Sequence, residues 1–165
     1  MFQLHILVYI LKVFDARSRH RIMIPEEEYQ NGHILTSETV TALADEGVKV
    51  NLGAHGQLQG LGAHWELWML QQGGLSNHEA LKAATINGAG YIGVADELGS
   101  LEKGKLADLI IMDKNPLENI KNSNSVIYTM VNGRLYDVNT MNEIGNYKTK
   151  RSKFYLQLFT DIVKK

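Results

Sequence analysis

The stretch Val48-Lys-Val-Asn-Leu-Gly-Ala-His-Gly-Gln57 places a short run with alternating apolar residues directly before a glycine-rich loop. Alternation of this kind predicts a β-strand over residues 48–52. Just upstream, residues 36–44 have the apolar spacing of a short helix, and Glu46-Gly47 ends it. A helix followed by a strand is the step from which α/β folds are built. The chain is therefore expected to be an α/β protein.

Two further helices are expected after the glycine loop. Residues 63–72 are apolar on most of the helical circumference, which predicts a buried helix that Gly73-Gly74 ends. Ser76-Asn-His-Glu79 is a capping box, in which the serine accepts from a first-turn N–H and the glutamate reaches back. That helix is expected to continue to Asn87-Gly88, with a further short helical turn through Tyr91.

From about Leu98 the apolar period changes to that of β-strands. Residues 109–112 form one short apolar run, and residues 126–131 and 134–136 flank Asn132-Gly133. An Asn-Gly pair between such runs is the strongest local signal for a hairpin. A small β-module is therefore expected after the helices. The basic tail, residues 148–165, is expected to pack back as an amphipathic element.

The composition points to a globular protein that acts on small molecules. A chain of 165 residues with 44% hydrophobic and 21% charged residues fits one domain with a core. The net charge of -1 predicts no nucleic-acid partner. The apolar start, residues 1–11, is too short to span a membrane and is interpreted as a buried strand. The absence of cysteine fits a reducing compartment, which favours the cytoplasm and leaves the periplasm open.

Polar residues gather in and after the glycine loop, and three of them are candidate site residues. His55 follows the end of the predicted strand, where α/β proteins place their chemistry, and is the candidate catalytic residue. Gln57 and His64 are the candidate substrate-binding residues. The alternatives are a His55 bonded only to loop backbone and a His64 that is a packed and locally hydrogen-bonded ring. This loop does not offer the three ligands of a catalytic metal site, so no metal ligand is assigned.

Gly99-Ser-Leu-Glu-Lys-Gly-Lys105 matches the first seven positions of a phosphate-binding loop, but Leu106 stands where that loop needs Ser or Thr. A strand is predicted after it, whereas a phosphate-binding loop needs a helix there. We therefore interpret it as a charged turn that leads into residues 109–112.

Three motifs follow one another along the chain: Glu79-Ala-Leu-Lys-Ala-Ala-Thr85, Gly99-Ser-Leu-Glu-Lys-Gly-Lys-Leu-Ala-Asp-Leu109 and Asn132-Gly-Arg-Leu-Tyr-Asp137. This order resembles the C-terminal end of the metal-dependent amidohydrolase superfamily. It is especially similar to the imidazolonepropionase- and prolidase-like branch, and within it to members that carry β-propeller repeats upstream. The resemblance covers roughly residues 22–145.

The resemblance implies a (β/α)8 TIM barrel with a small β-sandwich, and hydrolysis of C–N bonds by a metal-activated water. Residues 1–97 would supply the last β/α units of an incomplete barrel, residues 98–147 a segment of the composite sandwich, and residues 148–165 a tail. The intact parent would bind a divalent metal, with zinc expected, and would act on a small amide or peptide-like substrate. No metal is expected in this chain alone.

Two departures from the superfamily's pattern bear on activity. In most members the last barrel strand ends in an aspartate that contacts the metal, and His55 stands at that place here. The first-strand His-x-His pair has no counterpart in the 165 residues, and a whole barrel needs about 250 residues. The chain alone is therefore expected not to hydrolyse such substrates. Its open strand edges would be covered by its own ends, by a homo-oligomer or by a missing N-terminal portion.

Two other functions remain open at this point. One is a non-catalytic α/β binding or assembly module that kept the end of the barrel and lost the metal. The other is anion binding by backbone N–H groups near residues 60–63, at the start of the helix that follows the loop.

Overall fold

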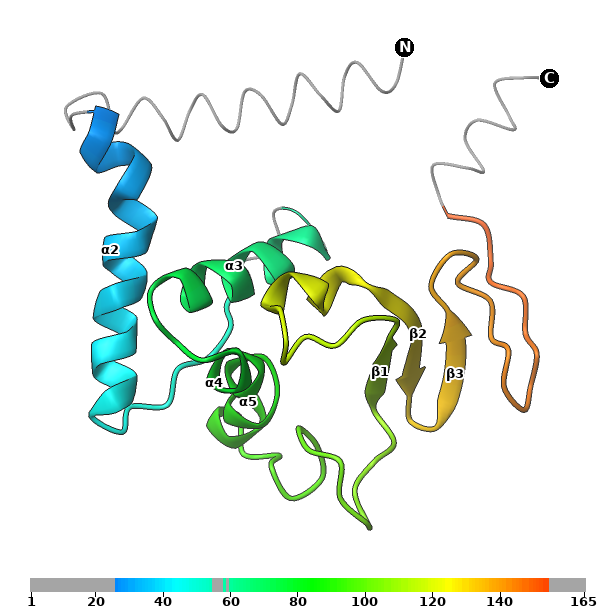
Figure 1. The fold of residues 1–165 in the computed structure, drawn as a ribbon. Helices are drawn as coiled ribbons and strands as arrows, with labels where there is room; N and C mark the ends of the chain where they lie inside the picture. Colours follow the sequence, from blue (N-terminus) through cyan, green and yellow to red (C-terminus); the bar gives the residue numbers. More distant parts are fainter. Residues whose placement is uncertain (1–25, 55–57, 59, 155–165) are drawn as a thin grey trace.

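A computed structural model describes residues 26–54, 58 and 60–154 of the chain. Within these residues four α-helices precede a three-stranded antiparallel sheet, so the described fold is mixed α/β (Figure 1). The helices gather on one side of the molecule and the sheet lies on the other, with the 3-10 helix η1 (Ile120–Asn124) between them. None of the described helices combines the length and the apolar character that crossing a membrane requires.

The first described helix, α2 (Glu26–Asp45), is longer than the predicted helix over residues 36–44. It begins directly after Pro25, and proline before a run of glutamates is a common way to open a helix. α2 packs against α3 (Leu61–Gln72), and Gly73, directly after α3, lies close to the backbone of α2. A Cβ built on Gly73 would lie 2.2 Å from the carbonyl carbon of Ser37, so only glycine fits at this crossing.

The predicted cap of the next helix is confirmed in its main contact. α4 (Asn77–Ala83) begins after Ser76, whose Oγ accepts a hydrogen bond from the Glu79 N–H at 3.1 Å. The Glu79 carboxylate pairs with Lys82 at 3.0 Å instead of reaching back to the cap. The helix ends at Ala83, earlier than predicted, and α5 (Ile86–Tyr91) forms the further helical turn.

The core lies between the helices and η1. One cluster of buried side chains joins Leu67 of α3, Ala80 of α4 and Ile120 of η1. A second joins Leu70, Leu75 and Ala83 and packs against half-buried side chains of α2. The prediction that the α3 segment is a buried helix is wrong in part, because Trp65 and Met69 are each 37% exposed. The faces of α3 toward α2, α4 and η1 are covered.

The predicted strand over residues 48–52 is wrong: residues 48–54 have no regular secondary structure. The segment has an apolar alternation but no neighbouring strand among the described residues, and a strand exists only through its ladder. Its backbone is held by single contacts. The Leu52 N–H donates to the Ala83 carbonyl at 3.0 Å, and the Asn87 side chain donates to the Val50 carbonyl at 3.0 Å.

The sheet confirms the predicted β-module. β1 (Leu109–Met112), β2 (Val126–Val131) and β3 (Arg134–Asp137) pair in the order β1-β2-β3. Asn132 and Gly133 both have positive φ, 48° and 76°, as the tight hairpin turn requires. Tyr136 also pairs with Glu143 in an isolated bridge, which brings the following loop alongside β3.

The two predicted terminal elements fall mostly on residues that the structure does not describe. The buried strand over residues 1–11 lies outside the described residues, and so does the tail beyond residue 154. Residues 148–154 have no regular secondary structure. The amphipathic tail therefore stays a prediction.

Candidate functional site

Of the three candidate site residues, His55 and Gln57 lie outside the described residues, and His64 is described. The start of the glycine loop is anchored to α3, the helix that follows this loop. The Gly53 N–H donates to the Glu66 carboxylate on α3 at 2.9 Å. Glu66 thereby holds the beginning of the glycine loop against the first turns of α3, where His64 also lies.

His64 is part of a polar contact between α3 and η1. Its Nδ1 lies 3.0 Å from the hydroxyl of Ser123, which is 59 residues further along the chain. The imidazole is half-buried beside Trp68, with ring centroids 6.4 Å apart and an interplanar angle of 31°. Burial lowers the pKa of His64, because it penalises the charged imidazolium.

Trp68 completes this contact one turn further along α3. Its indole N–H lies 3.1 Å from the Ile120 carbonyl and 3.0 Å from the Ser123 hydroxyl, and it donates to both. Ser123 is only 1% exposed. His64, Trp68 and Ser123 therefore form one connected group at the junction between the helices and the strand module, which we call the α3–η1 polar cluster.

Sequence reasoning found one member of this cluster as a site residue. Trp68 lies in the segment predicted as a buried helix, and Ser123 lies in residues 119–125, which carry no motif that predicts a site. The alternative for His64, a packed and hydrogen-bonded ring, matches its surroundings, although its partner is distant in sequence. A separation of this size leaves no spacing signal that could have revealed Ser123.

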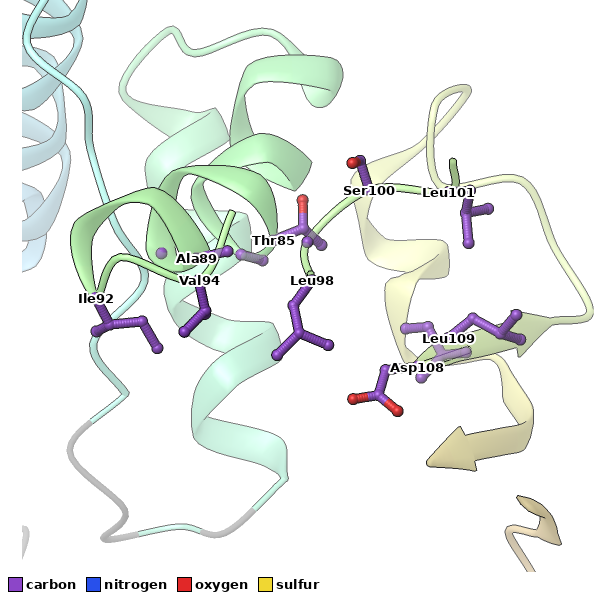
Figure 2. Close-up of a pocket in the computed structure, with 13 residues that line it drawn as sticks. Thr85, Ala89, Ile92, Val94, Leu98, Ser100, Leu101, Asp108 and Leu109 are labelled. Carbon is purple, nitrogen blue, oxygen red and sulfur yellow. The ribbon is translucent and has the colours of Figure 1, made fainter. Parts of the chain in front are cut away.

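A separate pocket of about 540 Å³ lies between α5 and β1. Figure 2 shows Ile92, Val94 and Leu98 facing it from the helical side and Leu109 with Asp108 from the strand side. The lining is mostly apolar, and the Asp108 carboxylate accepts a hydrogen bond from the Asn132 N–H. His64 is not among the lining residues, so the predicted site and this pocket are different places.

The loop that resembles a phosphate-binding motif behaves as a turn. Lys105 is only 12% exposed and donates to the Ala95 carbonyl and to the Ser100 hydroxyl, both at 2.6 Å. Its ammonium group therefore ties the loop to the end of the helical part. β1 follows three residues after Leu106, as predicted.

The described residues do not fit the metal that the resemblance implies. No group of three or more His, Asp or Glu side chains that could hold a metal ion occurs in residues 26–54, 58 and 60–154. A catalytic zinc site takes about three protein ligands. The Nδ1 of His64 already contacts Ser123. No catalytic step through a metal is therefore derived from these residues.

The fold and the motif order define a class, and comparison with known proteins identifies it. Residues 34–136 match the amidohydrolase family. This match covers more than half of the chain, and the chain belongs to that family.

Similar proteins carry several enzyme names. A 5-methylthioadenosine/S-adenosylhomocysteine deaminase of Teredinibacter turnerae is 37% identical over 111 residues, which cover 59% of this chain and 25% of that protein. An imidazolonepropionase of Symbiobacterium thermophilum is 62% identical over 39 residues, 24% of this chain and 9% of that protein. The chain thus spans a quarter or less of the length of these relatives.

Two solved structures are also similar to this chain. A Xaa-Pro dipeptidase with bound methionine in its active site is similar with a TM-score of 0.56 and 33% identity, over 61% of this chain and 25% of that one. A prolidase complexed with N-methylphosphonate-L-proline is similar with a TM-score of 0.53 and 26% identity, over 74% of this chain and 32% of that one. The similarity to members with β-propeller repeats is not tested by these comparisons.

Proposed function

We propose that this chain is the C-terminal portion of a metal-dependent amidohydrolase that hydrolyses C–N bonds, and that it is inactive alone. The observation that carries the proposal is the family match over residues 34–136 in a chain that spans a quarter or less of its relatives. The names of these relatives and structures, deaminase, imidazolonepropionase and dipeptidase, support hydrolysis of a C–N bond in a small substrate.

In this proposal residues 1–97 supply the last β/α units of a (β/α)8 barrel and residues 98–147 a segment of the small sandwich. The β1-β2-β3 sheet supports the second assignment, because its strands carry no fully buried side chain and it needs another layer to cover it. Residues 48–52 would become a strand only when neighbouring strands are present, which explains why the apolar alternation stands there without a ladder.

The metal and most of its ligands would come from the portion that precedes the matched region. The divalent metal, with zinc expected, supplies an activated water when it is bound. This chain would contribute His55 as a catalytic residue and Gln57 and His64 as substrate-binding residues. A homo-oligomer or a separate N-terminal portion would cover the open faces.

A chimera tests the proposal. Residues 34–136 replace the corresponding C-terminal segment of the Xaa-Pro dipeptidase, and hydrolysis of an Xaa-Pro dipeptide is measured with and without a chelator. We expect metal-dependent turnover by the chimera and none by the 165-residue chain with added zinc. A second chimera with His64→Gln serves as the matched variant, and it is expected to raise KM.

Two results would contradict the proposal. Metal-dependent turnover by the 165-residue chain alone would show that it is not an incomplete enzyme. A chimera that folds and binds zinc but does not turn over would favour the non-catalytic binding or assembly module.

A further inference from the structure

Ser123 contacts both Nδ1 of His64 and the indole N–H of Trp68, each at 3.0 Å. We propose that Ser123 is a positioning residue that holds His64 as a neutral imidazole protonated at Nε2. The assignment of the proton rests on the α3–η1 polar cluster alone. Only the use that His64 makes of that proton rests on the proposed function.

Trp68 fixes the direction of one hydrogen bond at Ser123. An indole N–H can only donate, so where it contacts Ser123 at 3.0 Å the serine oxygen must accept. One acceptor position of the Ser123 oxygen is therefore occupied. The same indole N–H also donates to the Ile120 carbonyl, which fixes Trp68 against η1 and keeps this direction of donation.

The hydroxyl proton of Ser123 must therefore find a different acceptor. At 1% exposure this residue has no access to bulk water, and a buried hydroxyl donor needs an acceptor. Among the contacts of the described residues, the acceptor within reach is Nδ1 of His64 at 3.0 Å. If Nδ1 carried a proton instead, the serine oxygen would receive two donors and its own proton would have no partner.

A hydrogen bond from Ser123 to Nδ1 in turn limits where His64 can carry its proton. An imidazole that accepts at Nδ1 and is neutral carries its proton at Nε2. Protonation of both nitrogens would turn Nδ1 into a donor facing Ser123. Burial also disfavours this positively charged form of the ring. The cluster thus selects one tautomer among the three states of the ring.

This tautomer defines what His64 can do. Nε2–H is a hydrogen-bond donor, suited to a carbonyl or carboxylate oxygen of an amide or peptide-like substrate. Neither ring nitrogen is then free as a base or as a metal ligand, since Nδ1 accepts from Ser123 and Nε2 holds a proton. His64 would bind and orient a substrate oxygen rather than transfer a proton.

The ¹⁵N signals of the imidazoles test the assignment without any activity measurement. The 165-residue chain is labelled at histidine and recorded at about pH 8, above the ordinary pKa of the side chain. His64→Gln identifies the signals of His64, and the exposed His78 is the internal reference. We expect an unprotonated Nδ1 and a protonated Nε2 at His64. A protonated Nδ1, or signals averaged between the two tautomers, would overturn the proposal.

Two serine variants test the role of Ser123. Ser123→Ala removes the donor, and we expect the single tautomer of His64 to be lost in favour of a mixture. Ser125→Ala is the matched control, because its hydroxyl bonds to Asn122 and Lys114 in the same loop. It should leave the His64 signals unchanged. An unaltered single tautomer in folded Ser123→Ala would overturn the role of Ser123, and the wild-type spectrum decides the tautomer even if that variant does not fold.

The measurement separates this proposal from the proposed function. A failed chimera leaves the tautomer standing, because the spectrum needs neither metal nor substrate. A protonated Nδ1 in an active chimera would remove only the role assigned here.

Discussion

The guanidinium of Arg134 donates two hydrogen bonds to the carboxylate of Glu143, from Nε to Oε1 at 3.1 Å and from Nη2 to Oε2 at 2.7 Å. The Glu143 side chain has no exposed surface, whereas that of Arg134 is 46% exposed. The guanidinium also lies 5.2 Å from the ring centre of Tyr147. This pair fastens the loop after β3 to the sheet, because Glu143 also pairs with Tyr136 in the isolated bridge.

Glu143→Gln is expected to lower the melting temperature and to flatten its dependence on acid pH. The hydrogen bonds from Arg134 lower the pKa of Glu143. A carboxyl group whose pKa is lower in the folded chain stabilises the fold at neutral pH. That contribution is lost from about pH 4.3, the ordinary pKa of a glutamate side chain, down to the lower pKa of the folded chain. Thermal melts between neutral and acid pH measure the difference.

Glu118→Gln removes the same charge from an exposed carboxylate that contacts only Asn115 within the described residues. Its melting temperature should therefore fall at acid pH about as much as that of the unmodified chain. If the melting temperatures of the unmodified chain and of Glu143→Gln fall in parallel at acid pH, the role of the Arg134–Glu143 pair is contradicted.

Gly73→Ala is expected to destabilise the chain by about 1–3 kcal/mol, the usual cost of overpacking. The added methyl group would meet the backbone of α2 at Ser37 and Glu38, and backbone cannot move aside as a side chain can. Chemical denaturation measures the free energy of unfolding. Gly88→Ala is the matched control. It lies in α5 with open space around its Cβ position, so it should stabilise by about 0.5–1 kcal/mol.

Ser76→Ala is expected to cost about 1 kcal/mol of stability, because it removes the side-chain acceptor for the Glu79 N–H at the start of α4. Ser152→Ala changes an exposed serine outside any helix and should be neutral. Denaturant midpoints for the two variants give the comparison. An equal, small effect of both would show that α4 does not depend on its cap.

Trp68→Phe and Ser123→Ala are expected to be coupled. Each single change breaks the hydrogen bond between the Trp68 N–H and the Ser123 hydroxyl, at a cost of about 0.5–1.5 kcal/mol. The double variant removes donor and acceptor together, so its loss should be smaller than the sum of the two single losses. A double-mutant cycle from denaturation curves measures this coupling energy. Strict additivity would mean that the indole N–H and the hydroxyl do not interact.

Local signals in the sequence predicted the elements whose cause is local. The Asn132-Gly133 turn, the Ser76 cap and the apolar run of β1 each follow from a few neighbouring residues, and all three are present. The family was predicted from the order of three motifs, and the match over residues 34–136 confirms it.

The misses share one physical cause, which is dependence on distant parts of the chain. Residues 48–52 have the alternation of a strand, but alternation cannot supply the neighbour with which a strand pairs. Trp65 and Met69 are apolar, yet nothing in the described residues covers them fully. Ser123 became visible only when folding brought η1 to α3. His55 and Gln57 fall outside the described residues, and their roles stay predictions.

The distribution of the core has a consequence for how the chain opens. Both buried clusters lie on α3, α4, η1 and the segment before α4, while no side chain in β1, β2 or β3 is fully buried. Segments with little buried apolar surface exchange their amide hydrogens through low-energy local unfolding. The backbone amides of the sheet will therefore exchange with deuterium well before those of α3 and α4. The described fold will unfold as two cooperative units rather than one.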